Sequence, residues 1–425
     1  MKNVFKLLPF PFLLFGEGFE IQPVGNLQYR YVEKSKKFSS LGESVYQTKK
    51  VDYEDYIIGG TFGAKSSWQN YEASGLLYGV KRLHTKDENE LHIEKILYDN
   101  DQNGFGFFGE LYLQSNFENS SFSIGRQTKK SALVDSNERV TKNSFEGLKY
   151  RRTQNDIDFE VFYFNKIAAS TISNSVPFNH KYGFLGYGLG YKIDGFTDIS
   201  THILNKDLDT LGALQVQLKV GDVKDYLKME NLFVDNFFDI VSFEGQKSFE
   251  KISLRGGFVA QKSVGEDYVE KEYDKKLDSK IFQGEIKYKK ELLSLVYRIS
   301  KTDSNTDAVF NGTLFSPFSN KPAWIVGIST AHSTIADTVA QQLMFVNTFY
   351  AGKLPLTLAS SYLTYAIGEE NGLENKSTNT DEFYTHFQAH LSKNLSLTFQ
   401  YSKVGNIDIV TTNTEVKKAI VEWKF

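Results

Sequence analysis

Few residues in this sequence have the types and spacing that a catalytic or metal-binding site requires. His386 and His390 are four positions apart. On a strand that spacing separates two side chains by about 13 Å along one face, too far to chelate a single ion. No G-x-S-x-G elbow and no phosphate-binding P-loop is present, and cysteine is absent. The sequence therefore indicates neither an enzyme nor a thiolate metal site, and we expect no cofactor.

One stretch does match a metal-binding template. Asp99, Asp101 and Asn103, followed by Gly104 and Glu110, have the spacing of an EF-hand calcium loop. An EF-hand needs a helix on each side, whereas Glu110 lies in a segment that alternates like a strand. We therefore interpret the stretch as an ordinary Asn/Asp/Gly turn. The alternative is a Ca²⁺ ion held by the loop oxygens of Asp99, Asp101 and Asn103.

The elements that must position the remaining polar residues are β-strands. Leu395, Leu397, Phe399 and Tyr401 take one parity, and serine, threonine and glutamine take the other. Successive strand side chains point to opposite faces, so this pattern predicts one apolar and one polar wall. The pattern recurs in about twenty segments of about ten residues, among them 105–113, 157–163, 185–191 and 282–288, well above the usual strand length of about five or six. Helical periodicity is nowhere sustained, which predicts an all-β protein.

Composition supports this interpretation and limits the function. Aromatic residues make up 15% of the 425 residues, and only 7 are proline. Lys and Arg number 49 against 52 Asp and Glu, giving a net charge of −3, without the basic excess that is typical of nucleic-acid-binding proteins. No stretch approaches the 18 or so apolar residues of a transmembrane helix.

The first residues have the order of an export signal. Lys2 and Lys6 precede a short apolar run, and Gly16 and Gly18 supply small residues before a cleavage position at Phe19. The run is too short to span a bilayer. We therefore assign residues 1–18 to a signal peptide and residues 19–425 to one transmembrane domain.

The connections between strands come in two sizes. Short polar turns are predicted near 116–120, 153–156, 194–195, 289–291 and 393–394, and long polar segments near 34–50, 83–102, 128–142, 168–181, 262–278, 301–321 and 369–380. Short turns at one end and long loops at the other are typical of outer-membrane barrels. Both ends of such a chain lie on the same side, so the strand number is even. This requirement places residues 323–331 inside one long connection from 301 to about 338.

The last predicted strand carries an assembly signal. Ala419, Val421, Trp423 and Phe425 share one face of residues 415–425. A terminal aromatic residue, with another two positions before it, resembles the signal that the barrel-assembly machinery recognises, here Trp423 and Phe425. Lipid cannot satisfy an open sheet edge, so a membrane sheet must close on itself.

The central segment resembles a known family. Gly125-Arg126-Gln127, then Leu133, Asp135 and Arg139, then Ser144-Phe145-Glu146-Gly147 are similar to the pattern of the OprD-like bacterial outer-membrane porins. The resemblance is strongest over residues 121–150. It implies a transmembrane antiparallel up-and-down β-barrel of about 18 strands, with 20 as the alternative. It also implies inward-folded loops and a ladder of basic residues in the lumen. By the same resemblance the loop at 128–142 is the candidate constriction, with Lys129, Lys130, Asp135, Glu138 and Arg139, and Arg126 is one of the pore-lining residues.

Strand parity predicts which charged residues face the lumen. Charge on the lipid face costs about 2–4 kcal/mol at the bilayer midplane, so charged residues opposite an apolar face should point inward. The residues predicted to line the pore on this basis are Lys149, Arg151, Asp158, Glu160, Arg255 and Arg298, with Glu110 and Glu285 as further acids.

Two functions of different classes follow from these features. The favoured one is a passive outer-membrane diffusion channel for small hydrophilic solutes and ions, which a water-filled, charge-lined barrel would sieve by field and diameter. The alternative is a plugged structural or adhesive barrel whose long loops bind a partner. The expected partners are membrane lipid and lipopolysaccharide, the assembly machinery, the solutes and a second and third copy in a homotrimer, without nucleic acid. An active receptor with an N-terminal plug domain ranks third.

Overall fold

The computed structural model describes most of the predicted barrel. Its described residues are 20–40, 47–87, 104–136, 142–168, 213–235, 237–265, 274–314, 316, 319, 322–325, 332–372, 377–405 and 412–425. The predicted signal peptide, the calcium-loop residues Asp99, Asp101 and Asn103, the constriction residues Glu138 and Arg139, and the predicted strand and turn within 185–195 lie outside them. No helix among the described residues is long and apolar enough to cross a membrane.

Eighteen strands and two short 3-10 helices form the described structure. The strands are β1 (Glu20–Ser40), β2 (Gln47–Trp68), β3 (Tyr71–Asp87), β4 (Gly104–Asn116), β5 (Ser120–Gln127), β6 (Ser144–Gln154), β7 (Ile157–Ala168), β8 (Ala213–Gly221), β9 (Tyr226–Val234), β10 (Phe238–Phe249), β11 (Ile252–Ser263), β12 (Asp278–Lys290), β13 (Leu293–Thr302), β14 (Thr338–Ala351), β15 (Leu354–Ile367), β16 (Thr378–His390), β17 (Leu395–Val404) and β18 (Thr412–Lys424). The helices are η4 (Val309–Gly312) and η5 (His332–Thr334).

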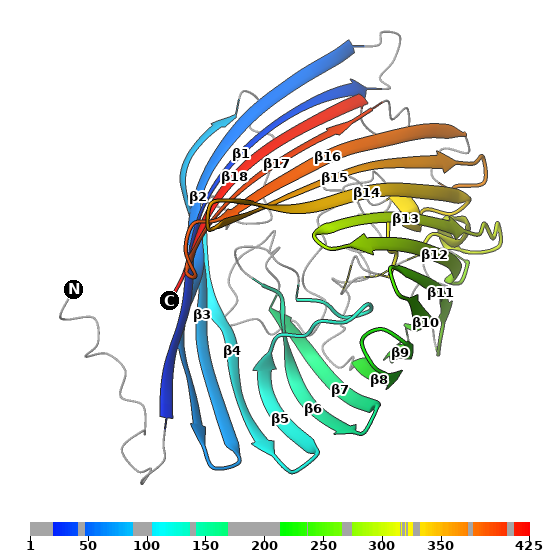
Figure 1. Cartoon of the computed structure of the whole chain (residues 1–425). Coiled ribbons are helices and arrows are strands. Elements are labelled where there is room, and N and C mark those ends of the chain that lie inside the picture. The colour runs from blue at the N-terminus through cyan, green and yellow to red at the C-terminus, as the bar shows by residue number, and fades with distance from the viewer. Residues whose placement is uncertain are drawn as a thin grey trace.

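The strands form one closed antiparallel sheet (Figure 1). Each strand pairs with its neighbours in sequence, and β1 also pairs with β18, in a register that places Leu27 opposite Trp423. Gly25 and Phe425 complete this seam with two backbone hydrogen bonds of 3.1 and 3.0 Å. The predicted all-β barrel of about 18 strands is confirmed, and the alternative of 20 is not.

The connections divide between the two ends of the barrel, as predicted. Turns of two to four residues join β2 to β3, β4 to β5 and so on to β16 and β17, and we call this the turn end. The opposite end, the loop end, carries the long connections, although only 235–237 joins β9 to β10 there. Residues 322–325 lie in the connection between β13 and β14, as the parity argument required.

One predicted loop is wrong. Residues 34–50 were expected to form a long connection, but β1 runs to Ser40 and β2 begins at Gln47. The two strands pair without interruption from Lys34 opposite Tyr53 to Ser40 opposite Gln47. The polar composition of residues 34–50 hid this extension, because such a sequence lacks the apolar alternation that marks a membrane strand.

The outward face is apolar around the barrel. Leu27, Ile124, Leu254 and Tyr297 belong to a large set of exposed apolar side chains that recur at every second residue along the strands. Three phenylalanines lie in one row across β10, β11 and β12, because Phe243 is opposite Phe258 and Phe258 is opposite Phe282. Such a face is suited to lipid, where charged groups are costly.

The inward face is divided along the barrel axis. Near the loop end it carries apolar clusters, one of which includes Phe145, Phe162, Phe164, Leu232 and Val259. Residues of the connections complete this cluster, namely Leu133, Val134, Val309 and Leu314. A second cluster combines Ile325 and Ile335 with the inward side chains of β14 and β15. Nearer the turn end, the inward residues are mainly charged or polar.

Candidate functional site: charged inner wall and two inner loops

Ion pairs join neighbouring strands on the inner wall. Arg151 of β6 forms a two-pronged pair with Asp158 of β7, in which Nε and one terminal nitrogen each lie 2.9 Å from a carboxylate oxygen. This fork-to-fork geometry is strong and directional. It lies beside the two-residue turn at 155–156, so it stands at the turn end of the wall.

Arg255 on β11 has both an acidic and an aromatic partner. Its guanidinium donates to Glu244 of β10 at 2.6 Å and lies 3.8 Å from the centre of the Trp324 ring. The flat guanidinium can stack on an aromatic face, which a lysine ammonium cannot do in the same way. Gly257 makes room for the ring, because a Cβ there would lie 2.5 Å from Trp324 Cζ2.

Arg298 on β13 forms the third pair of this wall. It donates to Glu285 of β12 at 2.6 Å, to the Gln342 side chain at 3.0 Å and to the backbone oxygen of Trp324 at 3.3 Å. Gln283 adds two contacts, donating to the Pro322 oxygen at 2.8 Å and accepting from the Trp324 N–H at 2.6 Å. Residues 322–325, which we call the second inner loop, are therefore held against β11–β14.

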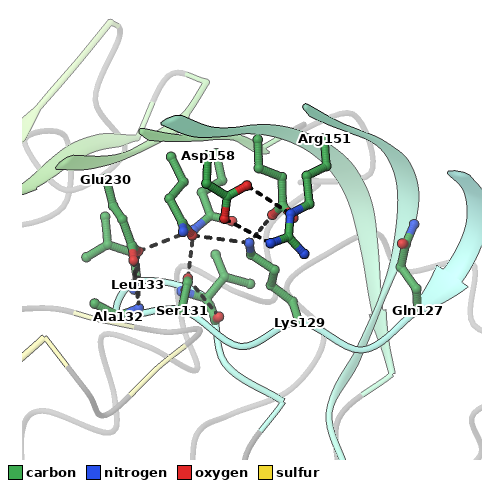
Figure 2. Close-up of polar contacts among 12 residues, drawn as sticks. Gln127, Lys129, Ser131, Ala132, Leu133, Arg151, Asp158 and Glu230 are labelled. Atoms are coloured by element: carbon green, nitrogen blue, oxygen red, sulfur yellow. Dashed lines mark hydrogen bonds and ion pairs between the residues drawn. The ribbon is translucent and has the colours of Figure 1, made fainter. Parts of the chain in front are cut away.

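Residues 128–136, which we call the first inner loop, lie against β7, β8 and β9 inside the barrel. Figure 2 shows Lys129, Ser131, Ala132 and Leu133 directed toward this wall. Lys129 pairs with Glu160 of β7, and Gln215 of β8 donates to the Ser131 hydroxyl at 2.7 Å. The loop therefore narrows the lumen from the side of β7–β9.

The tip of the first inner loop is bound by Glu230 of β9 (Figure 2). The Ala132 N–H donates to its carboxylate at 3.1 Å and the Leu133 N–H at 3.2 Å. Gln215 also donates to Glu230, at 3.4 Å, and Lys228 forms an ion pair with it. Only 1% of Glu230 is exposed. A buried carboxylate is stable only when hydrogen bonds and a counter-charge replace its water, and here both are present.

Lys149 differs from the other inward cations. It shares its face of β6 with Arg151, opposite the outward Leu148 and Tyr150, and it is half-buried. No ion pair joins it to another residue of the described structure. Its ammonium is therefore an inward charge on β6 that no carboxylate of the described structure pairs with.

Two residues assigned to the pore by resemblance do not face the open lumen. Arg126 shares its parity on β5 with the outward Phe122 and Ile124, and it pairs with Glu146 at 2.9 Å. It was assigned by resemblance, and the alternation of its own strand places it on the outer face. Asp135 is 2% exposed and its backbone bridges to Lys130 within the first inner loop, so it is part of the loop's interior.

The remaining predicted residues lie on the inner wall or at the seam. Those on the inner wall are Lys149, Arg151, Asp158, Glu160, Arg255 and Arg298. Trp423 and Phe425 lie at the seam, with their ring centres 5.1 Å apart. Among the described residues, no group of three or more His, Cys, Asp or Glu side chains could hold a metal ion.

Sequence reasoning missed Glu230 and Trp324. Leu227, Met229 and Phe233 face outward, so parity alone would have placed Glu230 inward. Nothing local indicates its partners, which lie nearly a hundred positions away in the first inner loop. The sequence placed Trp324 in a connection between strands. Its packing against Gly257 is a tertiary contact that no local sequence pattern indicates.

Solved structures with the same fold are porins. The chain has a TM-score of 0.66 and 13% identity to OccK5 (OpdH) of Pseudomonas aeruginosa, over 96% of this chain and 98% of that one. It has a TM-score of 0.65 and 13% identity to a BenF-like porin of Pseudomonas fluorescens Pf-5, over 95% and 98%. For OccAB3 of Acinetobacter baumannii the values are 0.63 and 10%, over 95% and 100%. The sequence matches no family model and no curated protein. The resemblance to OprD-like porins is confirmed at the level of the fold.

Proposed function

We propose that the chain is a passive diffusion channel of the bacterial outer membrane, without enzymatic activity, for small hydrophilic solutes and ions. The observation that carries this proposal is the contrast between the two faces of one closed sheet. The outer face is apolar around the barrel, and the inner face carries Arg151–Asp158, Arg255–Glu244 and Arg298–Glu285 as neighbouring ion pairs. Charged walls of this kind suit a water-filled lumen.

The shared fold supports the same function, since the solved structures of this shape include a BenF-like porin. The inner loops support a restricted rather than a wide path, because both lie against the inner wall. Lys149, whose ammonium has no ion-pair partner among the described residues, favours small anionic or amphoteric solutes. In this proposal residues 1–18 direct export, and Trp423 and Phe425 direct assembly into a membrane that contains lipopolysaccharide.

A plugged barrel with binding loops is the second candidate, and one observation favours it. Part of the inner wall near the loop end is apolar and packs against Leu133, Val134, Val309 and Leu314. A plugged interior needs inward apolar packing of this kind. The charged wall nearer the turn end favours the channel, because unhydrated charges would be costly in a closed interior.

Conductance separates the two candidates. The refolded protein would be inserted into a planar bilayer with a salt gradient, and single-channel current and reversal potential would be recorded. We expect discrete open steps, with a reversal potential whose sign shows whether the inward Lys and Arg residues outweigh the acids. A heat-modifiable, folded barrel that conducts nothing would exclude the channel and favour the plugged barrel.

A further inference from the structure

Three carboxylates of the inner wall hold the first inner loop. The Thr128 hydroxyl donates to Glu110 of β4 at 3.3 Å, and Lys129 pairs with Glu160 of β7. Glu230 of β9 accepts from the backbone of Ala132 and Leu133. The loop is therefore attached at its start, at its second residue and at its tip, to strands on both sides of its own hairpin.

The attachment at Glu230 is different from the other two. Glu110 and Glu160 bind side chains, whereas Glu230 binds main-chain N–H groups at the tip of the loop. Hydrogen bonds to a charged acceptor are about twice as strong as neutral ones. Leu133 and Val134, which follow the bound N–H groups, are fully buried in the apolar cluster. Glu230 thus lies where the charged part of the wall meets the apolar part.

The contact is also needed by Glu230 itself. If the loop moved away, the carboxylate would keep Lys228 and Gln215 but lose two backbone donors in a buried position. Leaving a buried carboxylate with fewer donors is costly, so the loop and the glutamate stabilise each other in one arrangement.

We propose that Glu230 is a positioning residue that fixes the first inner loop in the lumen and thereby sets the width and steadiness of the conducting path. This inference rests on the proposed channel function for its effect on current. The position of the loop is measured independently of current, by chemical labelling of a single introduced cysteine. The chain contains no other cysteine, so the label reacts at that position alone.

The test combines E230A and E230Q with the reporter Val134→Cys. Val134 is fully buried, so a charged maleimide should label V134C slowly in the otherwise unchanged protein. Removing charge-assisted hydrogen bonds should raise the labelling rate in E230A by roughly tenfold or more. E230Q keeps one neutral acceptor and should label at an intermediate rate. Open-channel noise should increase in the same order.

Glu422→Gln is the matched control. Glu422 also faces inward, but it binds only side chains at the seam, Asn26 at 3.1 Å and Gln28 at 2.8 Å, and Lys424. We expect E422Q to leave labelling of V134C and channel noise unchanged. Heat-modifiability on a gel shows for each variant whether the barrel has formed, and E230Q carries the test if E230A does not fold.

The outcomes separate the two claims. Folded E230A and E230Q with the labelling rate and noise of the parent would overturn the positioning role. Absence of conductance in the parent, with labelling that still follows E230A > E230Q > parent, would exclude the channel while supporting the loop attachment.

Discussion

The two inner loops are held on different parts of the wall by opposite chemistry. The first inner loop offers backbone N–H groups and an ammonium to carboxylates of the wall, chiefly Glu230 and Glu160. The second inner loop offers an aromatic ring and carbonyl oxygens to cations and amides of the wall. Trp324 is seated on Gly257 beneath the Arg255 guanidinium.

Because of this difference, the attachment of the first inner loop should depend on charge, and the attachment of the second inner loop should depend on shape. The first loop needs negative charge on the wall, because carboxylates bind both the N–H groups at its tip and the Lys129 ammonium. The second loop needs room for a ring and a flat cation above it, and most of its hydrogen bonds have a neutral acceptor. Substitutions that alter charge should therefore affect the first loop, and substitutions that alter shape should affect the second.

The largest effect should come from Gly257→Val. A Cβ at this position would lie 2.5 Å from the Trp324 ring, so the second loop must leave its seat. Overpacking typically costs about 1–3 kcal/mol, and the cation–π contact is lost as well. We expect a lower midpoint of thermal unfolding and a red-shifted tryptophan emission. Gly256→Val is the control, since its Cβ would meet nothing within 4 Å on the outer face. Equal midpoints of thermal unfolding for Gly257→Val and Gly256→Val would contradict the packing of Trp324 on Gly257.

Arg255→Lys should have the next largest effect. The substitution retains the positive charge but loses the planar stack on Trp324, a contact of about 0.5–2 kcal/mol. We expect hydrogen exchange at the second inner loop to increase, while the reversal potential stays unchanged. Unchanged exchange would mean that Gly257 and Gln283 hold the loop without the guanidinium.

Lys149→Gln should alter selectivity and leave both loops in place. The ammonium has no ion-pair partner in the described structure, so its removal breaks no ion pair there and makes the lumen more negative. We expect the reversal potential to shift toward cation preference at unchanged thermal stability. Lys353→Gln removes the same charge from the β14–β15 turn and should not shift it. A shift of the same size in both variants would show that only net charge matters.

The smallest effect should be at the turn end of the β8–β9 hairpin, where no described contact joins Asp222 to either inner loop. The backbone N–H groups of Asp225 and Lys224, both 2.7 Å from the Asp222 carboxylate, hold the pKa of Asp222 below its usual value. A lowered folded-state pKa stabilises the β8–β9 turn above the unfolded pKa, and this stabilisation is lost as pH falls through the folded pKa. Asp222→Ala should therefore raise amide exchange of the turn at neutral pH but not in acid. Altered exchange in either inner loop would contradict the independence of these regions.

The sequence predicted the barrel well because alternation is a local property. Parity alone placed Lys149, Arg255 and Arg298 inward, where the structure has them. Parity did not predict where either inner loop contacts the wall, because Glu230 and Trp324 contact residues that are distant in the sequence. Arg126 was placed among the pore-lining residues by resemblance, against the parity of Phe122 and Ile124 on its own strand. Parity gives the face of a residue, and only the folded chain gives its partner.

The seam between β1 and β18 has a consequence for how the barrel is made. Gly25 and Phe425 exchange backbone hydrogen bonds although they lie 400 positions apart in the sequence. Contacts of such long range form late, after most of the entropy of ordering the chain has been lost. Until then the edges of β1 and β18 are open to other strands, which is a risk of aggregation. The edges of β1 and β18 therefore need protection throughout synthesis and transport of the chain. Once these two strands pair and the barrel closes, that protection is no longer needed.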